Sequence, residues 1–112
     1  MISLDKYRET LERHAAKQGL QMNPDWEEVR PLLEGLLRNG ERYGLRTCPC
    51  RPAAGVKDKD LDIVCPCVYA KPDVEEHGAC YCWLFVSQAW ADGEAPHIQV
   101  PERRPPEKTL DF

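Results

Sequence analysis

Apolar side chains recur at helical spacing in the first forty residues of the chain. Residues 3–18 place them on one face of a predicted amphipathic helix, at Leu4, Tyr7, Leu11 and Ala15. Ser3 can cap the start of this helix and Gly19 can end it. We therefore predict a first helix over residues 3–18.

A second amphipathic helix is predicted to begin at Asn23-Pro24-Asp25, where a capping side chain, a proline and acidic residues come together. Its apolar face holds Trp26, Val29, Leu33, Leu36 and Leu37, and Asn39-Gly40 is its predicted end. Pro31 lies inside this pattern and lacks a backbone N–H, so we expect a kink or a break there. Residues 1–40 should form a helical cap over the rest of the chain.

The remaining sequence is less regular. Residues 42–82 indicate loops and short helices, with one helix starting within residues 58–62 and a helical turn at 73–76. The apolar run at 83–86 fits either a strand or a buried helix. The proline-containing tail, 101–112, is expected to run extended over the surface. The fold class is therefore mainly α.

The chain of 112 residues is expected to form one domain over residues 1–112. Its start is charged from Asp5 onward, and no apolar run has the length of a signal peptide or a membrane span. We therefore expect a cytoplasmic protein. The net charge of −4 and the isoelectric point of about 5.4 argue against a nucleic-acid partner.

Charge is unevenly distributed along the sequence. Residues 41–71 carry six basic and four acidic side chains, whereas residues 72–97 carry five acidic and no Lys or Arg side chains. Two interpretations stay open. The difference is ordinary solvated surface, or the basic stretch forms a face for an acidic electron donor.

All six cysteines fall into three Cys-x-Cys pairs, Cys48-Pro49-Cys50, Cys65-Pro66-Cys67 and Cys80-Tyr81-Cys82. In extended backbone the two thiols of a pair point the same way, so they can serve one centre, or one can bind while the other waits beside it. Structural disulfides do not persist in a cytoplasmic protein. The cysteines therefore indicate metal binding or redox chemistry.

A site built only from thiolates suits zinc or iron–sulfur. Structural zinc prefers cysteines separated by two to four residues, a spacing that is absent from the three pairs. Proline beside ligand cysteines is typical of iron–sulfur proteins, and a [4Fe–4S] cluster uses four thiolates, which leaves two. The pattern favours iron–sulfur, while zinc and a set of three disulfides remain alternatives.

The chain resembles the catalytic chain of ferredoxin:thioredoxin reductase over roughly residues 23–86. The resemblance rests on the three ordered pairs and their flanks: Glu41-Arg42-Tyr43-Gly44, Cys48-Pro49-Cys50-Arg51, Ile63-Val64-Cys65-Pro66-Cys67-Val68 and Cys80-Tyr81-Cys82-Trp83-Leu84-Phe85. The preceding helical sequence, Asn23-Pro24 and Leu33-Glu34-Gly35-Leu36-Leu37, is also similar to the family.

This resemblance implies a division of the cysteines. The ligands of a [4Fe–4S] cluster would be Cys48, Cys65, Cys67 and Cys80. The redox-active disulfide would join Cys50 and Cys82, which are also expected to be the catalytic residues. The domain would be small and mainly α-helical, organised around the cluster beneath its N-terminal helical cap.

The resemblance also implies a reaction. Ferredoxin would supply electrons singly, and the product would be a reduced thioredoxin-like protein. Cys50 would be the free nucleophile that attacks the target disulfide, and Cys82 would associate with the cluster and later resolve the mixed disulfide. In the family, a separate small β-barrel subunit often accompanies this chain.

Two features differ from plant-type members of the family. Tyr81 stands where those chains have a histidine that is thought to move protons. Fourteen residues separate the first two pairs and twelve separate the last two, against a longer first and a shorter second interval in plant-type chains. Such features resemble deeper-branching bacterial and archaeal ferredoxin:disulfide reductases. They leave open the proton carrier and the identity of the disulfide partner.

Several residues near the pairs are candidates for supporting roles. Arg46 and Arg51 could lower the pKa of Cys50 or pair with surface acids. Among the histidines, His77 is the best candidate to carry protons, with an exposed loop position as its alternative, whereas His14 and His97 are expected to be structural.

The aromatic residues have two expected roles. Trp83, Leu84 and Phe85 should shield the centre, while Trp26 and Trp90 should belong to the core.

Two other functions fit the sequence. One is a ferredoxin-dependent reductase of a low-molecular-weight disulfide, which would need a closed pocket in place of a groove for a protein. The other is a zinc-stabilised interaction module without enzymatic activity, which metal analysis would distinguish.

Overall fold

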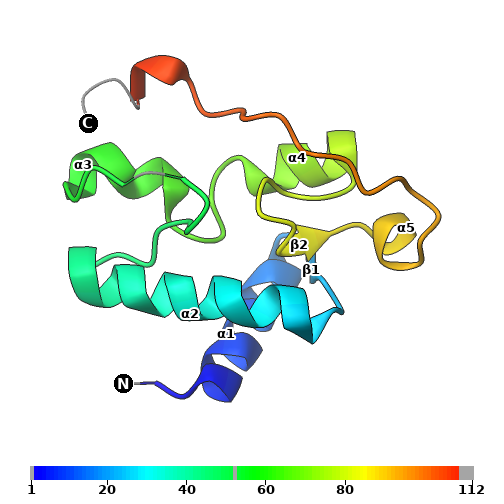
Figure 1. The fold of residues 1–112 in the computed structure, drawn as a ribbon, viewed down its shortest axis with the longest axis horizontal. Coiled ribbons are helices and arrows are strands. Elements are labelled where there is room, and N and C mark those ends of the chain that lie inside the picture. The colour runs from blue at the N-terminus through cyan, green and yellow to red at the C-terminus, as the bar shows by residue number, and fades with distance from the viewer. Residues whose placement is uncertain (1, 52, 109–112) are drawn as a thin grey trace.

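The computed structural model describes residues 2–51 and 53–108, and helices make up about half of the chain (Figure 1). The elements in chain order are α1 (Leu4–Lys17), β1 (Gln21–Met22), α2 (Trp26–Tyr43), α3 (Lys57–Asp60), the 3-10 turn η1 (Leu61–Ile63), α4 (Ala70–His77), β2 (Phe85–Val86), α5 (Gln88–Ala91) and the 3-10 turn η2 (Pro106–Lys108). The expectation of a small, mainly α structure is confirmed.

The first predicted helix is confirmed in α1. The side chain of Ser3 accepts a hydrogen bond from the backbone N–H of Lys6 at 3.2 Å, which satisfies one of the free donors at the helix start. Tyr7, Leu11 and Ala15 are buried on one face, as the spacing predicts. Local sequence therefore determines both the start and the buried face of α1.

The second helix differs from its prediction at Pro31 and at its end. Of the kink or break expected at Pro31, the break is absent, since α2 continues through this residue; Glu27, whose carbonyl loses its usual donor, is exposed to water. It also does not end at Asn39-Gly40. The Asn39 side chain is half-buried and donates to the backbone of Thr47 at 2.9 Å, and α2 continues to Tyr43. Gly44, with φ of 79°, ends it instead.

The buried faces of α1 and α2 join one apolar core with the cysteine region. Tyr7, Leu11, Leu33 and Leu36 belong to the same cluster of buried residues as Cys67, Cys80, Leu84 and Phe85. The two helices cross on one side of the molecule, and the cysteine loops lie on the other (Figure 1). The helical cap thus packs directly against the residues that carry the chemistry.

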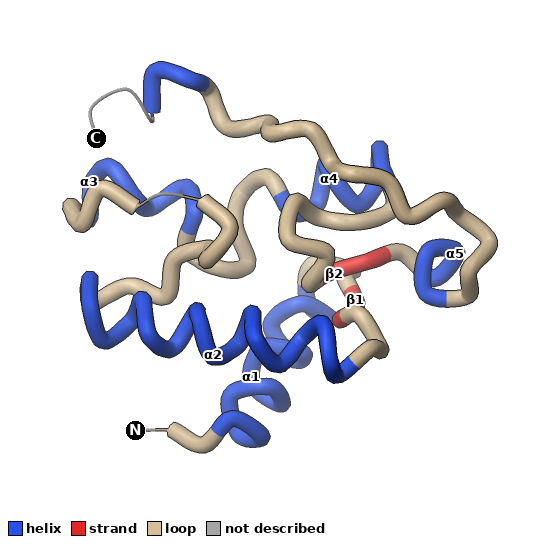
Figure 2. The backbone as a smooth tube through the Cα atoms, viewed as in Figure 1, coloured by secondary structure: helices blue, strands red, loops and turns tan. Residues whose placement is uncertain are grey.

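One antiparallel pairing ties the two parts together. β1 pairs with β2, with Gln21 opposite Val86 and Met22 opposite Phe85 (Figure 2). The apolar run at 83–86 is therefore partly a strand, and both of its strand residues are buried. The short sheet fixes the third cysteine pair relative to α1.

The C-terminal segment passes from α5 along α4 towards α3 (Figures 1 and 2). The predicted extended course is confirmed for residues 101–105, but Arg104 is buried, and Pro106–Lys108 forms a 3-10 turn. Residues 109–112 of the predicted tail lie outside the described residues. Within residues 2–51 and 53–108, the helices are all too short or too polar to cross a membrane.

Candidate metal and redox site

Backbone pairing brings the first two cysteine pairs together. Thr47 and Val64 form an isolated antiparallel bridge. Beside it, the N–H of Cys48 donates to the carbonyl of Ile63 at 2.7 Å, and the N–H of Cys65 donates to Arg46 at 3.0 Å. Cysteines 17 positions apart in sequence are therefore held side by side by main-chain hydrogen bonds.

The third pair lies in a tight turn before β2. The N–H of Cys80 donates to the carbonyl of Phe85 at 2.9 Å, and that of Trp83 donates to Cys80 at 2.9 Å. Trp83 has a φ of 64°, a left-handed conformation that is costly for a bulky residue. The buried side chain of Asn23 donates to the Trp83 carbonyl at 2.9 Å and helps to hold this conformation. The turn places Cys80 and Cys82 beside the other pairs.

Gly35 allows the first pair to approach α2. A Cβ atom at this position would lie 2.9 Å from Cβ of Pro49, closer than unbonded carbons pack. The central proline of Cys48-Pro49-Cys50 therefore rests against the helix where a side chain is missing. Sequence analysis noted Gly35 only as part of the family resemblance, because the partner that requires it is 14 positions away.

Five of the six cysteines line one cavity of about 340 Å³, a volume that includes its opening. These are Cys48, Cys65, Cys67, Cys80 and Cys82. The rest of the wall is mainly apolar, and consists of Leu32, Pro49, Arg51, Ala70, Tyr81, Leu84 and Phe85. The cavity is a small, thiol-rich site beneath the helical cap.

Cys50 differs from the other five, because it is exposed and does not line the cavity in the described structure. Its sulfur nevertheless lies in a group with those of Cys48 and Cys82, all within 4.8 Å of one another. The sulfurs of Cys48 and Cys82 are 2.8 Å apart, and all six cysteines are free thiols. The structure thus brings the sulfurs of Cys50 and Cys82 within 4.8 Å of each other with both cysteines free.

The surroundings lower the pKa of the Cys50 thiol and raise the pKa of the other five. Hydrogen bonds from Cys48 and Cys82 lower the pKa of Cys50 to about 4, with a smaller contribution from the charge of Arg51. Hydrogen bonding to Cys48 and Cys50 raises the pKa of Cys82. Burial raises the pKa of Cys65, Cys67 and Cys80, and hydrogen bonding to Cys50 raises that of Cys48. The exposed thiol is the one whose ionisation is favoured.

The donor set fits a soft metal centre. The described lining residues offer sulfur ligands and neither carboxylate nor imidazole, which suits zinc or iron–sulfur rather than magnesium or calcium. Closely packed thiols that are costly to ionise alone become thiolates when a cation binds them. The four predicted ligands, Cys48, Cys65, Cys67 and Cys80, all lie in this wall.

Arg51 has a role that sequence analysis did not anticipate. It is 5% exposed and donates from Nη1 to the sulfur of Cys67 at 3.4 Å. Its guanidinium carbon lies 4.6 Å from the ring centre of Tyr81 and 5.1 Å from that of Tyr69. The expected influence of its charge on the pKa of Cys50 is confirmed, while its hydrogen bond to a cysteine sulfur is with the second pair.

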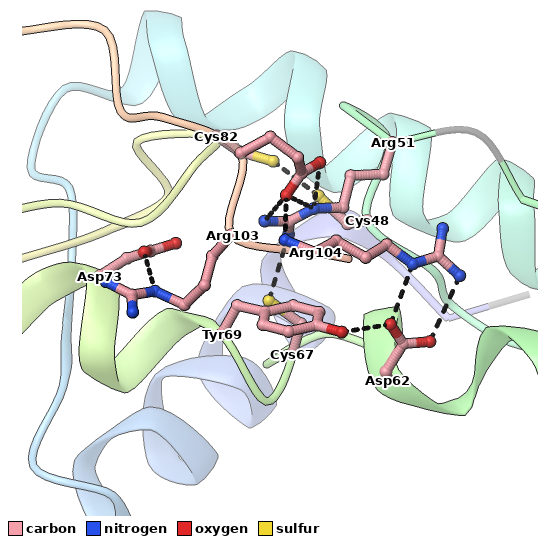
Figure 3. A network of polar contacts seen from close by, with 10 residues as sticks. Cys48, Arg51, Asp62, Cys67, Tyr69, Asp73, Cys82, Arg103 and Arg104 are labelled. Carbon is pink, nitrogen blue, oxygen red and sulfur yellow. Dashed lines mark hydrogen bonds and ion pairs between the residues drawn. The ribbon is translucent and has the colours of Figure 1, made fainter. Parts of the chain in front are cut away.

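The C-terminal segment holds Arg51 in place. Nε of Arg51 donates to both carboxylate oxygens of Glu102 at 2.9 Å, and Nη2 lies 2.8 Å from one of them. Two residues on, the buried Arg104 donates to Asp62 at 2.9 Å (Figure 3). Asp62 also accepts from the Tyr69 hydroxyl at 2.6 Å. The tail is therefore part of the site, which its proline-rich sequence did not reveal.

Some of the residues that were expected to shield the centre or carry protons line the cavity, and others do not. Leu84 and Phe85 line the cavity, but Trp83 packs against Trp90 with ring centres 5.4 Å apart. His77 ends α4 with a ring nitrogen 3.7 Å from Glu76 and does not line the cavity. The other two histidines lie away from its wall as well, at His14 and His97.

Comparison with known proteins identifies the family of this chain. The family model described as the ferredoxin thioredoxin reductase catalytic beta chain matches residues 2–103. The chain belongs to this family. A relative from Porphyra purpurea, the ferredoxin-thioredoxin reductase catalytic chain, is 31% identical over 90 residues, covering 76% of this chain and 70% of the relative. The corresponding chain from Synechocystis sp. is 30% identical over 81 residues, covering 68% and 63%.

Membership of the family confirms the resemblance seen in the sequence and makes the chain an oxidoreductase. Cysteines gathered around a potential metal site fit the iron–sulfur centre for which the family is known. The narrower likeness to bacterial and archaeal ferredoxin:disulfide reductases stays a prediction.

Proposed function

We propose that this chain is a ferredoxin-dependent disulfide reductase that acts on a thioredoxin-like protein. In this proposal, Cys48, Cys65, Cys67 and Cys80 hold a [4Fe–4S] cluster. Cys50 and Cys82 form the disulfide that is reduced and re-formed in each cycle. Ferredoxin and thioredoxin are the partners named for the relatives.

The observation that carries this proposal is the contrast between Cys50 and the other five cysteines. Five buried or half-buried cysteines line the cavity, whereas Cys50 is exposed with its sulfur within 4.8 Å of Cys82. A thiol that attacks a partner protein must be reachable from outside. A metal ligand, by contrast, is best kept away from solvent and oxidants.

The four predicted ligands fit a cluster because the described wall around them is mainly apolar and offers thiols, but neither carboxylate nor imidazole, as metal-binding groups. When bound, the cluster would supply one-electron chemistry beside a disulfide that needs two electrons. The apolar side chains of Leu32, Leu84 and Phe85 would exclude water from it. Two hydrogen bonds, from Arg51 to Cys67 and from the Phe85 N–H to Cys80, would fix ligand sulfurs.

Thiol–disulfide exchange then follows from the two remaining cysteines. The Cys50 thiolate attacks one sulfur of the target disulfide, which forms a mixed disulfide and releases one target thiolate. Cys82, half-buried beside it, attacks the Cys50 sulfur and releases the second target thiolate. The Cys50–Cys82 disulfide is thereby formed. Two electrons from ferredoxin and two protons from solvent restore the two thiols.

The wall of the cavity favours a protein substrate over a small charged disulfide. Arg51 is the charged side chain that the described wall offers, and its guanidinium is already bound by Glu102. A small disulfide with carboxylate groups would lack a free cation here. A protein can instead present its disulfide to the exposed Cys50.

The proposal is tested by anaerobic purification and assay. We expect a coloured protein with four irons and four acid-labile sulfides per chain, and release of thiols from a thioredoxin-like protein when reduced ferredoxin is supplied. The same assay with a low-molecular-weight disulfide should give little thiol. Colourless protein that contains zinc and no sulfide would contradict the proposal.

A further inference from the structure

A buried guanidinium lies between the C-terminal segment and a cysteine of the cavity. Arg51 presents two edges to two partners, with Nε and Nη2 against the Glu102 carboxylate and Nη1 against the sulfur of Cys67. Figure 3 shows Arg51 directed towards Cys67, close to the ring of Tyr69. The arrangement uses the planar fork of arginine, which a lysine cannot reproduce.

Each neighbour of Arg51 restricts its position. Tyr81 and Tyr69 lie within 5.1 Å of its guanidinium carbon, and its side chain is 1% exposed. Glu102 is itself held, because one of its oxygens accepts the backbone N–H of Arg104 at 2.9 Å. A donor fixed in this way costs little entropy when it binds sulfur.

The charge of Arg51 bears on any metal centre that Cys67 binds. A hydrogen bond to a ligand sulfur and a nearby positive charge both stabilise the more reduced, more negative state of an iron–sulfur centre. The effect is strengthened because the site is shielded from water. Glu102 offsets part of the charge but faces the opposite edge of the guanidinium, so Nη1 remains the group nearest to sulfur.

We propose that Arg51 is a positioning residue for Cys67 that raises the reduction potential of the bound centre, and that Glu102 holds it in this position. This inference rests on the proposed function, since it requires that Cys67 binds an iron–sulfur centre. Backbone N–H groups also donate to ligand sulfurs, as Phe85 does to Cys80, and exchanging a side chain for any residue but proline leaves such donors in place. Arg51 is therefore the donor that an experiment can change.

The test is an anaerobic redox titration of the accessible one-electron couple of the cluster, followed by its visible and electron paramagnetic resonance spectra. All proteins carry Cys50→Ser so that no disulfide takes up electrons. Arg51→Gln should shift the midpoint potential to a more negative value with iron and sulfide contents unchanged. Arg30→Gln, which removes an exposed arginine paired with Glu34, is the matched control and should leave the midpoint unchanged.

Arg51→Lys keeps the charge but cannot bind Glu102 and Cys67 together, so its midpoint should lie between those of the parent and Arg51→Gln. If Arg51→Gln does not retain the cluster, Arg51→Lys decides the question. If every Arg51 variant that retains a full cluster has the midpoint potential of the parent, the inference is overturned and the proposed function is not. Absence of an iron–sulfur centre in the unaltered protein would instead overturn the proposed function.

Discussion

The helical half of the molecule, residues 2–44, and the cysteine half, residues 45–108, are stabilised by different interactions. In the helical half, α1 and α2 start at capping side chains and bury continuous apolar faces. In the cysteine half, helices have eight residues or fewer, and isolated bridges and ion pairs fix the loops.

This difference separates local from long-range stabilisation. Helices with a buried apolar face are stabilised by contacts close in sequence and by the burial of that face. The cysteine loops depend on partners far apart in sequence, such as Arg51 and Glu102 at 51 positions, and on the centre that their thiols would bind. The comparison predicts that the two halves respond unequally to the same perturbation.

Removal of the proposed metal centre should have the largest effect. Anaerobic chelation is expected to expose the backbone of residues 45–86, because the thiols then repel one another or must take up protons. The helices α1 and α2 should lose less protection. Hydrogen–deuterium exchange by mass spectrometry before and after chelation measures this directly. Equal loss of protection in both halves would contradict the proposed division.

The substitution Asp62→Asn should cost about 3 kcal/mol of unfolding free energy, because it removes the charged acceptor that binds both the buried Arg104 and the Tyr69 hydroxyl. The Arg104 side chain is 0% exposed, so water cannot replace the lost partner. Anaerobic urea unfolding at pH 7 measures the change. A cost below about 1 kcal/mol would show that this ion pair contributes little to the cysteine half.

The contact between the halves is tested by Gly35→Ala, which should cost about 1–3 kcal/mol because the new Cβ meets Pro49 at 2.9 Å. Gly40→Ala in the same helix is the control. Its Cβ would meet Cγ of the flexible Arg46 side chain at 3.0 Å, so the change should stay within about 1 kcal/mol of zero. Equal changes in unfolding free energy for the two variants, measured by urea unfolding, would argue against close packing of Pro49 on α2.

The smallest change in unfolding free energy is expected for a substitution on the exposed face of the helical half. Glu34→Gln removes the ion pair with Arg30 four positions earlier, and both side chains are well exposed. We expect a change of about 0.5 kcal/mol or less in the same unfolding experiment. A cost near that of Asp62→Asn would mean that the helical half also depends on ion pairs.

Much of the helical half could be predicted because its signals are local. Ser3 and the spacing of Tyr7, Leu11 and Ala15 are sufficient to define α1. α2 runs past its predicted end, where the Asn39 side chain binds the backbone of Thr47 eight positions on, a contact that sequence alone does not reveal. The helix also continues through Pro31 without a break, which the missing N–H alone could not decide.

The candidate site was predicted in part. The three Cys-x-Cys pairs indicated a shared centre, and the family resemblance implied a division into ligands and a redox pair that stays a prediction. The contacts of Arg51 could not be predicted, because Cys67 and Glu102 are 16 and 51 positions away. Ion-pair partners at such distances depend on how the loops fold back, which residue spacing does not encode.

The central claim is that the two cysteines of one pair have different roles, and a matched pair of variants tests it most directly. Iron and acid-labile sulfide are measured in anaerobically purified Cys50→Ser and Cys48→Ser. We predict that Cys50→Ser retains the full cluster and loses disulfide reduction, whereas Cys48→Ser loses the cluster. A Cys50→Ser protein without iron, or a Cys48→Ser protein with a full cluster, would contradict the account.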